Sequence, residues 1–390
     1  MVLLLAVTCG VTVANLYYIQ PLLHTLGQAF HIGTGTTGLL VSVSQLGYMA
    51  GLAFVAPLGD LMERRSLIVF LLAAVAVLQG VLALAPSVTV FAAALLLTGI
   101  AAVATQIVVP MAAHLASDGN RGKVVGTVMS GLLLGILLSR TLSGIIAGLF
   151  DWRAVFWLSA GMMAALALVL WRSLPKMKPA TAMRYREALR SVITLIQAEP
   201  LLRQRMFIGG AMMGSFSVVW TALAFLLSGD HNHHYHYGNA TIGLFGLAGA
   251  AGAMAAQAAG RLSDRDRGAA ATSLAIILAL AGFVLMWLGA SSLLLLIAGI
   301  TVLDLGIQGA HISNQSAIFR LDPNARGRIT TAYMVAYFSG GLILSAATGA
   351  TYAAAGWTGT CVLGAASSAA AGLLWLLTAR HITIPGSSRA

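Results

Sequence analysis

About twelve apolar stretches follow one another along this chain, and the short segments between them differ sharply in charge. A helix needs about 20 apolar residues to cross the hydrocarbon core of a bilayer. Hydrophobic residues make up 59% of the 390 residues and charged residues only 8%, whereas a soluble domain carries about 25% charged residues. The sequence therefore predicts an all-α protein that crosses a membrane many times.

The apolar stretches fall into two sets, separated by a long polar segment. The first set predicts helices at 1–23, 38–57, 66–85, 88–114, 124–149 and 153–172. The second set predicts helices at 206–228, 239–259, 269–290, 292–317, 329–352 and 357–379. We therefore expect an amino-terminal bundle over 1–172, a linker over 173–205 and a carboxy-terminal bundle over 206–390. The first stretch lacks a basic region before it and a small-residue cleavage site, so it is interpreted as a spanning helix and not a signal peptide.

Lys and Arg gather in alternate connecting segments. All but two of the 22 basic residues, Arg140 and Arg153, lie on one side of the predicted membrane. Because short loops rich in Lys and Arg stay in the cytoplasm, both termini are expected there. The net charge of +11 is explained by this topology, and basic residues spread over many loops form no nucleic-acid-binding patch. Cys9 and Cys361 lie in apolar stretches and suggest neither a disulfide framework nor a metal site.

The polar segment between the two sets contains one helical pattern. Its apolar residues recur at helical spacing; they are Tyr185, Leu189, Val192, Ile193 and Ile196. This pattern predicts an amphipathic helix on the inner membrane surface that tethers the two bundles. A partner-binding role is the alternative interpretation.

The two sets are related by internal repetition. Leu58-Gly59-Asp60 corresponds to 262–264, 121–123 corresponds to 326–328, and 151–153 corresponds to 356–358. The offset is about 205 residues each time, which indicates a duplicated unit. Transporters are commonly built from two such halves around a central site.

Residues 56–65 carry a recognisable motif. They read Ala-Pro-Leu-Gly-Asp-Leu-Met-Glu-Arg-Arg and match the pattern G-x-L-x-D-R-x-G-R-R at the leucine, the aspartate and the paired arginines, but not at either glycine or the first arginine. A second copy at 260–265 is closer to the pattern. With the Asp-Trp-Arg-x-Val-Phe run at 151–156, the chain resembles the major facilitator superfamily. The run at 15–23 resembles a branch of bacterial members labelled efflux permeases.

The resemblance covers essentially the whole chain and carries several expectations. It implies two pseudo-symmetric six-helix bundles, alternating access, a bacterial inner-membrane location, a monomer and no cofactor or enzymatic activity. It also implies that Asp60, supported by Arg64 and Arg65, engages a helix N-terminus of the opposite half and closes the cytoplasmic side. Asp264 and Arg265 are the corresponding residues of the second copy. The alternative for Asp60 is a solvated loop charge that only sets topology, and Glu63 adds a like charge beside it.

Two charged residues fall well inside predicted spans, Arg140 and Asp304. Ionisable residues at that depth are costly and mark functional sites by default. Asp304 shares one helical face with Gln308, His311 and Gln315, so this face is expected to line a cavity. We expect Asp304 to couple proton movement to transport, with His311 as a relay or only a hydrogen-bonding partner. For Arg140 we expect pairing with Asp304, or a shared water network, in at least one transport state. The alternatives are a static ion pair that holds the two halves together and direct binding of an anionic substrate.

Other polar and aromatic residues in the predicted spans are candidates for the same cavity. They are Asn15, Tyr17, Tyr18, Gln20, Gln106, Trp220, Thr221, Tyr333 and Tyr337. Aromatic rings with a few polar groups suit a semi-polar organic substrate. Glycines at 243, 246, 249 and 252 predict close packing against the other half. The histidine-rich loop at 230–236 is interpreted as a solvated loop, and metal binding is the alternative. We predict no metal site.

These observations predict a secondary transporter that exports a small organic compound in exchange for protons. Its partners would be the compound, protons and the lipid bilayer, with no nucleic acid. No G-x-x-x-x-G-K-[ST] motif is present, so ATP is not expected to drive transport. The alternatives are proton-coupled or facilitated uptake, a non-transporting membrane sensor, and an integral-membrane enzyme.

Overall fold

The computed structural model describes residues 1–116, 120–177, 184–229, 235–249, 268–322 and 325–378, and these residues are almost entirely helical. The elements before the linker are α1 (Val2–Ala14), η1 (Gln20–Leu22), α2 (Leu23–Phe30), α3 (Thr34–Ala50), η2 (Gly51–Val55), α4 (Leu58–Leu61), α5 (Arg64–Leu84), α6 (Val88–Ala102), α7 (Ala104–Leu115), α8 (Arg121–Leu149) and α9 (Trp152–Ser173). The others are α10 (Tyr185–Ala198), α11 (Pro200–Ser228), α12 (Asn239–Leu244), η4 (Phe245–Gly249), α14 (Gly268–Leu288), α15 (Leu293–Ile318) and α16 (Arg326–Thr378).

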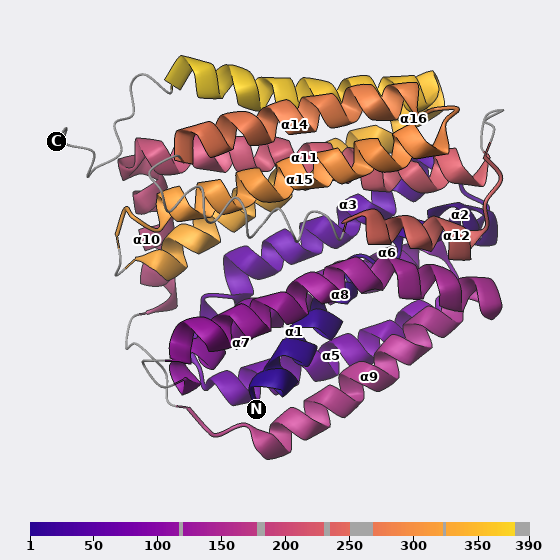
Figure 1. Cartoon of the computed structure of the whole chain (residues 1–390). Helices are drawn as coiled ribbons and strands as arrows, with labels where there is room; N and C mark the ends of the chain where they lie inside the picture. The colour runs from indigo at the N-terminus through magenta and orange to yellow at the C-terminus, as the bar shows by residue number, and fades with distance from the viewer. Residues whose placement is uncertain (117–119, 178–183, 230–234, 250–267, 323–324, 379–390) are drawn as a thin grey trace.

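The helices form two groups that lie side by side. In Figure 1, α1, α5, α7, α8 and α9 occupy the lower part of the view, and α11, α14, α15 and α16 the upper part. The groups meet where α3 packs against α16 and α12 packs against α8. We call the end that holds Arg64, Arg184 and Arg320 the basic end, and the end that holds the connections at 31–33 and 289–292 the opposite end.

Nine stretches within the described residues are long and apolar enough to cross a membrane. Three differences from the twelve predicted spans remain. The eighth, predicted at 239–259, is helical over Asn239–Leu244 and Phe245–Gly249, and 250–259 lie outside the described residues. The first is split, because the helix breaks after Ala14 and resumes as α2 beyond Pro21, whose ring removes a backbone donor. The last two are joined in α16 across Gly356, which has a left-handed φ of 58°. The predicted all-helical membrane fold is thus confirmed, and the boundaries differ where the chain bends.

The two groups touch through small residues toward the opposite end. A Cβ added at Gly38 would lie 3.1 Å from the Cα of Gly349, and one at Gly144 would lie 2.8 Å from the Cα of Gly243. Only glycine permits backbones to approach this closely. Hydrogen bonds cross the same contact: the hydroxyls of Ser42 and Ser345 are joined at 2.8 Å, and Gln45 Nε2 donates to Ser217 Oγ at 3.0 Å.

The linker helix predicted near 185–196 is present as α10 and is amphipathic, with Ile193 exposed and Val192 and Ile196 packed on the core. It contacts α16, and Tyr185 donates a hydrogen bond to the carbonyl of Phe54 in η2 at 2.7 Å. The helix therefore touches elements on both sides of the linker.

Candidate functional site

Arg140 projects from the middle of α8 into the contact between the two groups and is 3% exposed. Its Nε donates a hydrogen bond to Gln20 Oε1 at 2.5 Å. Its guanidinium carbon lies 3.9 Å from the ring centroid of Trp220, 4.8 Å from that of Tyr17 and 5.3 Å from that of Phe216. Ring faces attract a cation, most strongly when it is desolvated. The guanidinium is therefore held between both groups of helices.

Close backbone packing brings Arg140 to this place. A Cβ added at Gly246 would lie 2.9 Å from Arg140 Cβ, and one at Gly243 would lie 2.6 Å from the Arg140 carbonyl oxygen. The predicted packing of the glycine stripe on the other half is thus confirmed for Gly243 and Gly246, while Gly252 lies outside the described residues.

Asp304 lies on α15 and is 4% exposed. It is near enough to Arg140 for their charges to interact, but no ion pair within 4.0 Å joins the two described side chains. The indole of Trp220 adjoins both residues, yet its Nε1 lacks hydrogen-bond geometry to any described group. Asp304 Oδ1 and Arg140 Nη2 also have no hydrogen-bond partner in the described part of the chain. Buried polar atoms left in this state mark a place for water or a ligand.

A small cavity opens beside Arg140. Its volume is about 10 Å³, which is room for about one water molecule. It is lined by Leu16, Tyr17, Gln20, Ser44, Gln45, Tyr48, Met213 and Phe338. Gln45 Oε1 is buried without a partner among the described residues. Tyr17 and Gln20 line this small cavity, and both were predicted as residues of a substrate cavity. Gln45 was not predicted, although it is a polar residue within an apolar stretch.

A second polar cluster lies on α15 and α16, toward the basic end. His311 Nδ1 is 3.2 Å from Tyr333 Oη, and the His311 ring centroid is 4.7 Å from that of Tyr337. Asn314 Nδ2 donates to Tyr333 Oη at 3.4 Å. The structure thus brings together the predicted residues His311, Tyr333 and Tyr337, and Tyr337 is also near Asp304 and Tyr17.

Arg205 completes this cluster and was missed by sequence reasoning, which left it in the linker. It is 2% exposed, and its Nη1 donates to Asn314 Oδ1 at 3.1 Å and to Thr272 Oγ1 at 2.9 Å. Pro200 at the first position of α11 was the available signal, because proline favours that position and places Arg205 inside the helix.

The other predicted cavity residues have different surroundings. The Asn15 side chain forms its hydrogen bonds within the first group: its Nδ2 donates to the Val11 carbonyl and its Oδ1 accepts from Ser159. Tyr18 is buried beside Ser159. Gln106 Nε2 donates to Tyr48 Oη at 3.1 Å and so supports the cavity wall from behind. Thr221 is fully buried with an unpartnered Oγ1 among the described groups, and Gln308 is half-buried.

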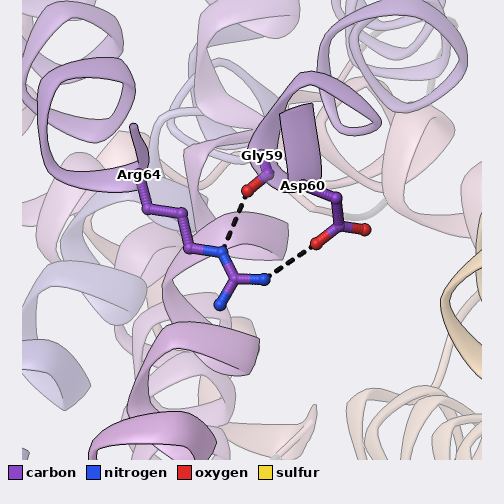
Figure 2. A network of polar contacts seen from close by, with 3 residues as sticks. All are labelled: Gly59, Asp60 and Arg64. Atoms are coloured by element: carbon purple, nitrogen blue, oxygen red, sulfur yellow. Dashed lines mark hydrogen bonds and ion pairs between the residues drawn. The ribbon is translucent and has the colours of Figure 1, made fainter. Parts of the chain in front are cut away.

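The predicted gate residues lie at the basic end. Figure 2 shows Arg64 bridging Asp60 and Gly59: Nη2 contacts Asp60 Oδ1 at 2.8 Å, and Nε donates to the Gly59 carbonyl at 2.9 Å. The Asp60 side chain is 60% exposed and contacts its own half. Arg65 Nη1 donates to the Leu174 carbonyl. Asp264 and Arg265, the corresponding residues of the second copy, lie outside the described residues.

Comparison with known proteins decides the family. Residues 5–344 match the family model described as "Major Facilitator Superfamily". The chain belongs to the major facilitator superfamily. It is therefore a multi-pass membrane transporter, and members of this superfamily bind small-molecule substrates.

Relatives and solved structures agree with this assignment. The chain is 44% identical over 375 residues to the uncharacterized transporter YgaY of Escherichia coli O157:H7, covering 96% of this chain and 94% of the relative. It is 34% identical over 363 residues to a probable transporter of Streptomyces coelicolor, covering 93% and 84%. A bacterial homolog of the human lysosomal transporter Spinster, in an inward-facing and unoccupied conformation, superposes with a TM-score of 0.80 at 13% identity over 97% of this chain and 96% of that one.

Proposed function

We propose that this transporter exports a small organic compound in exchange for protons, and that the proton and the compound compete for Asp304. The observation that carries the proposal is the buried Asp304 Oδ1, which has no hydrogen-bond partner in the described residues although Arg140 is near. A buried carboxylate oxygen without a partner is costly. Either a proton or a donor group of a substrate relieves that cost, and only one of them can occupy the oxygen at a time.

The position of Arg140 and Asp304 supports alternating access. Arg140 comes from the first group of helices and Asp304 from the second, and the aromatic ring of Trp220 lies against both. When the groups rock about this site, the separation of the two charges changes. Asp304 would then exchange its occupant differently in each state. In this proposal the single chain is the transport unit, it lies in a bacterial inner membrane, and both termini are cytoplasmic.

One observation favours a second candidate, the uptake of an anion together with a proton. Arg140 Nη2 also lacks a partner among the described residues, so it can bind an acceptor group of an anionic substrate. An anion at Arg140 would leave the proton on Asp304, and the two would travel together. The direction of proton movement separates the candidates.

The test is transport by purified protein in liposomes that contain a pH-sensitive dye. The liposomes are loaded in turn with organic cations, neutral compounds and organic anions. Exchange predicts that the lumen becomes more acidic as a compound leaves, whereas co-transport predicts that it becomes more alkaline. Asp304→Asn should abolish the compound-dependent pH change, and the exposed carboxylate variant Asp151→Asn should not. An unchanged pH response in Asp304→Asn would remove Asp304 from the mechanism.

A further inference from the structure

The residues around Arg205 form a chain of hydrogen bonds in which only one assignment of donors and acceptors is possible. A guanidinium has five donors and no acceptor. Asn314 must therefore turn its Oδ1 toward Arg205 Nη1, which lies 3.1 Å away. The other side of the same amide is then Nδ2, a donor, and it faces Tyr333 Oη. The cation thus fixes the orientation of the Asn314 amide.

The same order of donor to acceptor continues from Tyr333 to His311. Because Tyr333 Oη accepts from Asn314, its own hydrogen is available, and His311 Nδ1 lies 3.2 Å away as the acceptor. Tyr333 is fully buried, and no other acceptor contacts its hydroxyl in the described part of the chain. The reverse arrangement, with a hydrogen on Nδ1, would leave the hydroxyl hydrogen buried and unbonded, which is unfavourable.

The backbone makes room for this chain. A Cβ added at Gly209, one helical turn after Arg205, would lie 2.8 Å from Tyr333 Oη and 2.7 Å from its Cε2. The glycine therefore lets the phenol ring lie against α11, where its hydroxyl is between Asn314 and His311. Arg205 is held from its other side by the ring of Trp375, whose centroid is 4.8 Å away.

We infer that Arg205 is a positioning residue that holds His311 as the neutral tautomer with its hydrogen on Nε2, so that this ring offers a donor to a substrate bearing a carbonyl, carboxylate or other acceptor. His311 is half-buried, and its Nε2 contacts no described hydrogen-bonding group. Tyr337, which contacts the His311 ring, is also near Asp304, so the donor belongs to the same central region. The substrate class rests on the proposed function, whereas the hydrogen-bond chain does not.

The test is the nitrogen-15 NMR spectrum of the full-length protein labelled at histidine, with His311 assigned by its loss in His311→Gln. The expected signature at neutral pH is an unprotonated Nδ1 and a protonated Nε2. Arg205→Lys, which keeps a donor-only cation, should preserve it. Asn314→Asp keeps a partner for Arg205 but offers Tyr333 only an acceptor. The Tyr333 hydroxyl then donates to the carboxylate, its oxygen accepts from His311, and the hydrogen of the imidazole moves to Nδ1. Arg205→Met, which frees the amide to rotate, should give a mixture of tautomers.

Two results would overturn the inference. One is a hydrogen on Nδ1 in the unaltered protein. The other is an unchanged Nε2–H tautomer in Asn314→Asp, which decides the matter even when Arg205→Met does not fold. Because the readout needs no substrate, its failure is distinct from a failure of the proposed exchange of protons, which the liposome measurement reports separately.

Discussion

Glu63 is a residue whose charge state links pH to the stability of the basic end. Its carboxylate accepts hydrogen bonds from the backbone of Arg65, from the backbone and hydroxyl of Ser66, and from the backbone of Met177. Partial burial raises the pKa of this carboxyl, but these hydrogen bonds outweigh it and lower the pKa from 4.5 to about 2. Because the pKa is lower in the folded state, the stabilisation is present above about pH 4.5 and is lost as the pH falls toward 2.

We therefore predict that Glu63→Gln lowers the melting temperature of detergent-solubilised protein at pH 7 and has much less effect near pH 2. The expected loss at pH 7 is about 0.5–2 kcal/mol, the usual contribution of a side chain that caps a helix. Asp151→Asn is the matched control, because Asp151 forms only an exposed pair with Arg153 at 3.5 Å, and such pairs contribute little. An equal effect of Glu63→Gln at both pH values would contradict the prediction.

A second prediction concerns the side of the His311 ring that meets a substrate. Gln places its amide nitrogen near the position of Nε2, whereas Asn places its amide nearer to Nδ1. His311→Gln should therefore keep transport of an acceptor-bearing compound within a few-fold, and His311→Asn should reduce it about tenfold or more, as loss of one buried hydrogen bond of about 1.4 kcal/mol implies. Initial rates in liposomes measure this difference, and a reversed order would argue for Nδ1 as the contact.

The contact between α8 and α12 is an element-level feature whose role in closure can be tested. Gly144 and Gly243 lie backbone to backbone there, at the opposite end. We predict that Gly243→Val separates these helices and shifts the population toward states open at that end. Cysteine labelling near Asn239 should then become faster by several-fold.

The chain offers a control for this experiment. Gly161→Val lies on α9, where an added Cβ meets nothing within 4 Å, and should leave labelling unchanged. Cys9 and Cys361 are both buried and can be replaced first. Equal labelling in Gly243→Val and the unaltered protein would show that this contact does not control closure.

The sequence predicted the helices far better than their interruptions. Long apolar stretches specify spanning helices because the bilayer demands their length, and nine stretches of the described residues are long and apolar enough to span. The break after Ala14 and the early start of α11 at Pro200 depend on proline in a particular packing context, so they were missed. The same distinction holds at the candidate site: Arg140, Asp304 and His311 could be proposed from the sequence because charge and polarity are conspicuous in apolar spans, and the structure buries or half-buries all three. The Arg205 chain was missed because its direction depends on contacts between α11, α15 and α16.

At the scale of the whole molecule, we expect that a disulfide across the contact can hold the two groups of helices together. Ser42 Oγ and Ser345 Oγ are 2.8 Å apart across the contact between the groups. We predict that a Ser42→Cys/Ser345→Cys disulfide stops transport by holding the opposite end closed, and that a reductant restores it. Ser215→Cys/Ser368→Cys is the control, because these hydroxyls are also 2.8 Å apart but both belong to helices after the linker. Full transport with the first disulfide formed would contradict rocking at this contact.

The bond between Tyr185 and the Phe54 carbonyl has a mechanical consequence. With α10 attached to η2 through this bond and also packed against α16, one helix joins the two groups at the basic end. A tie of this kind limits how widely that end can open, and so limits the width of a molecule admitted from that side.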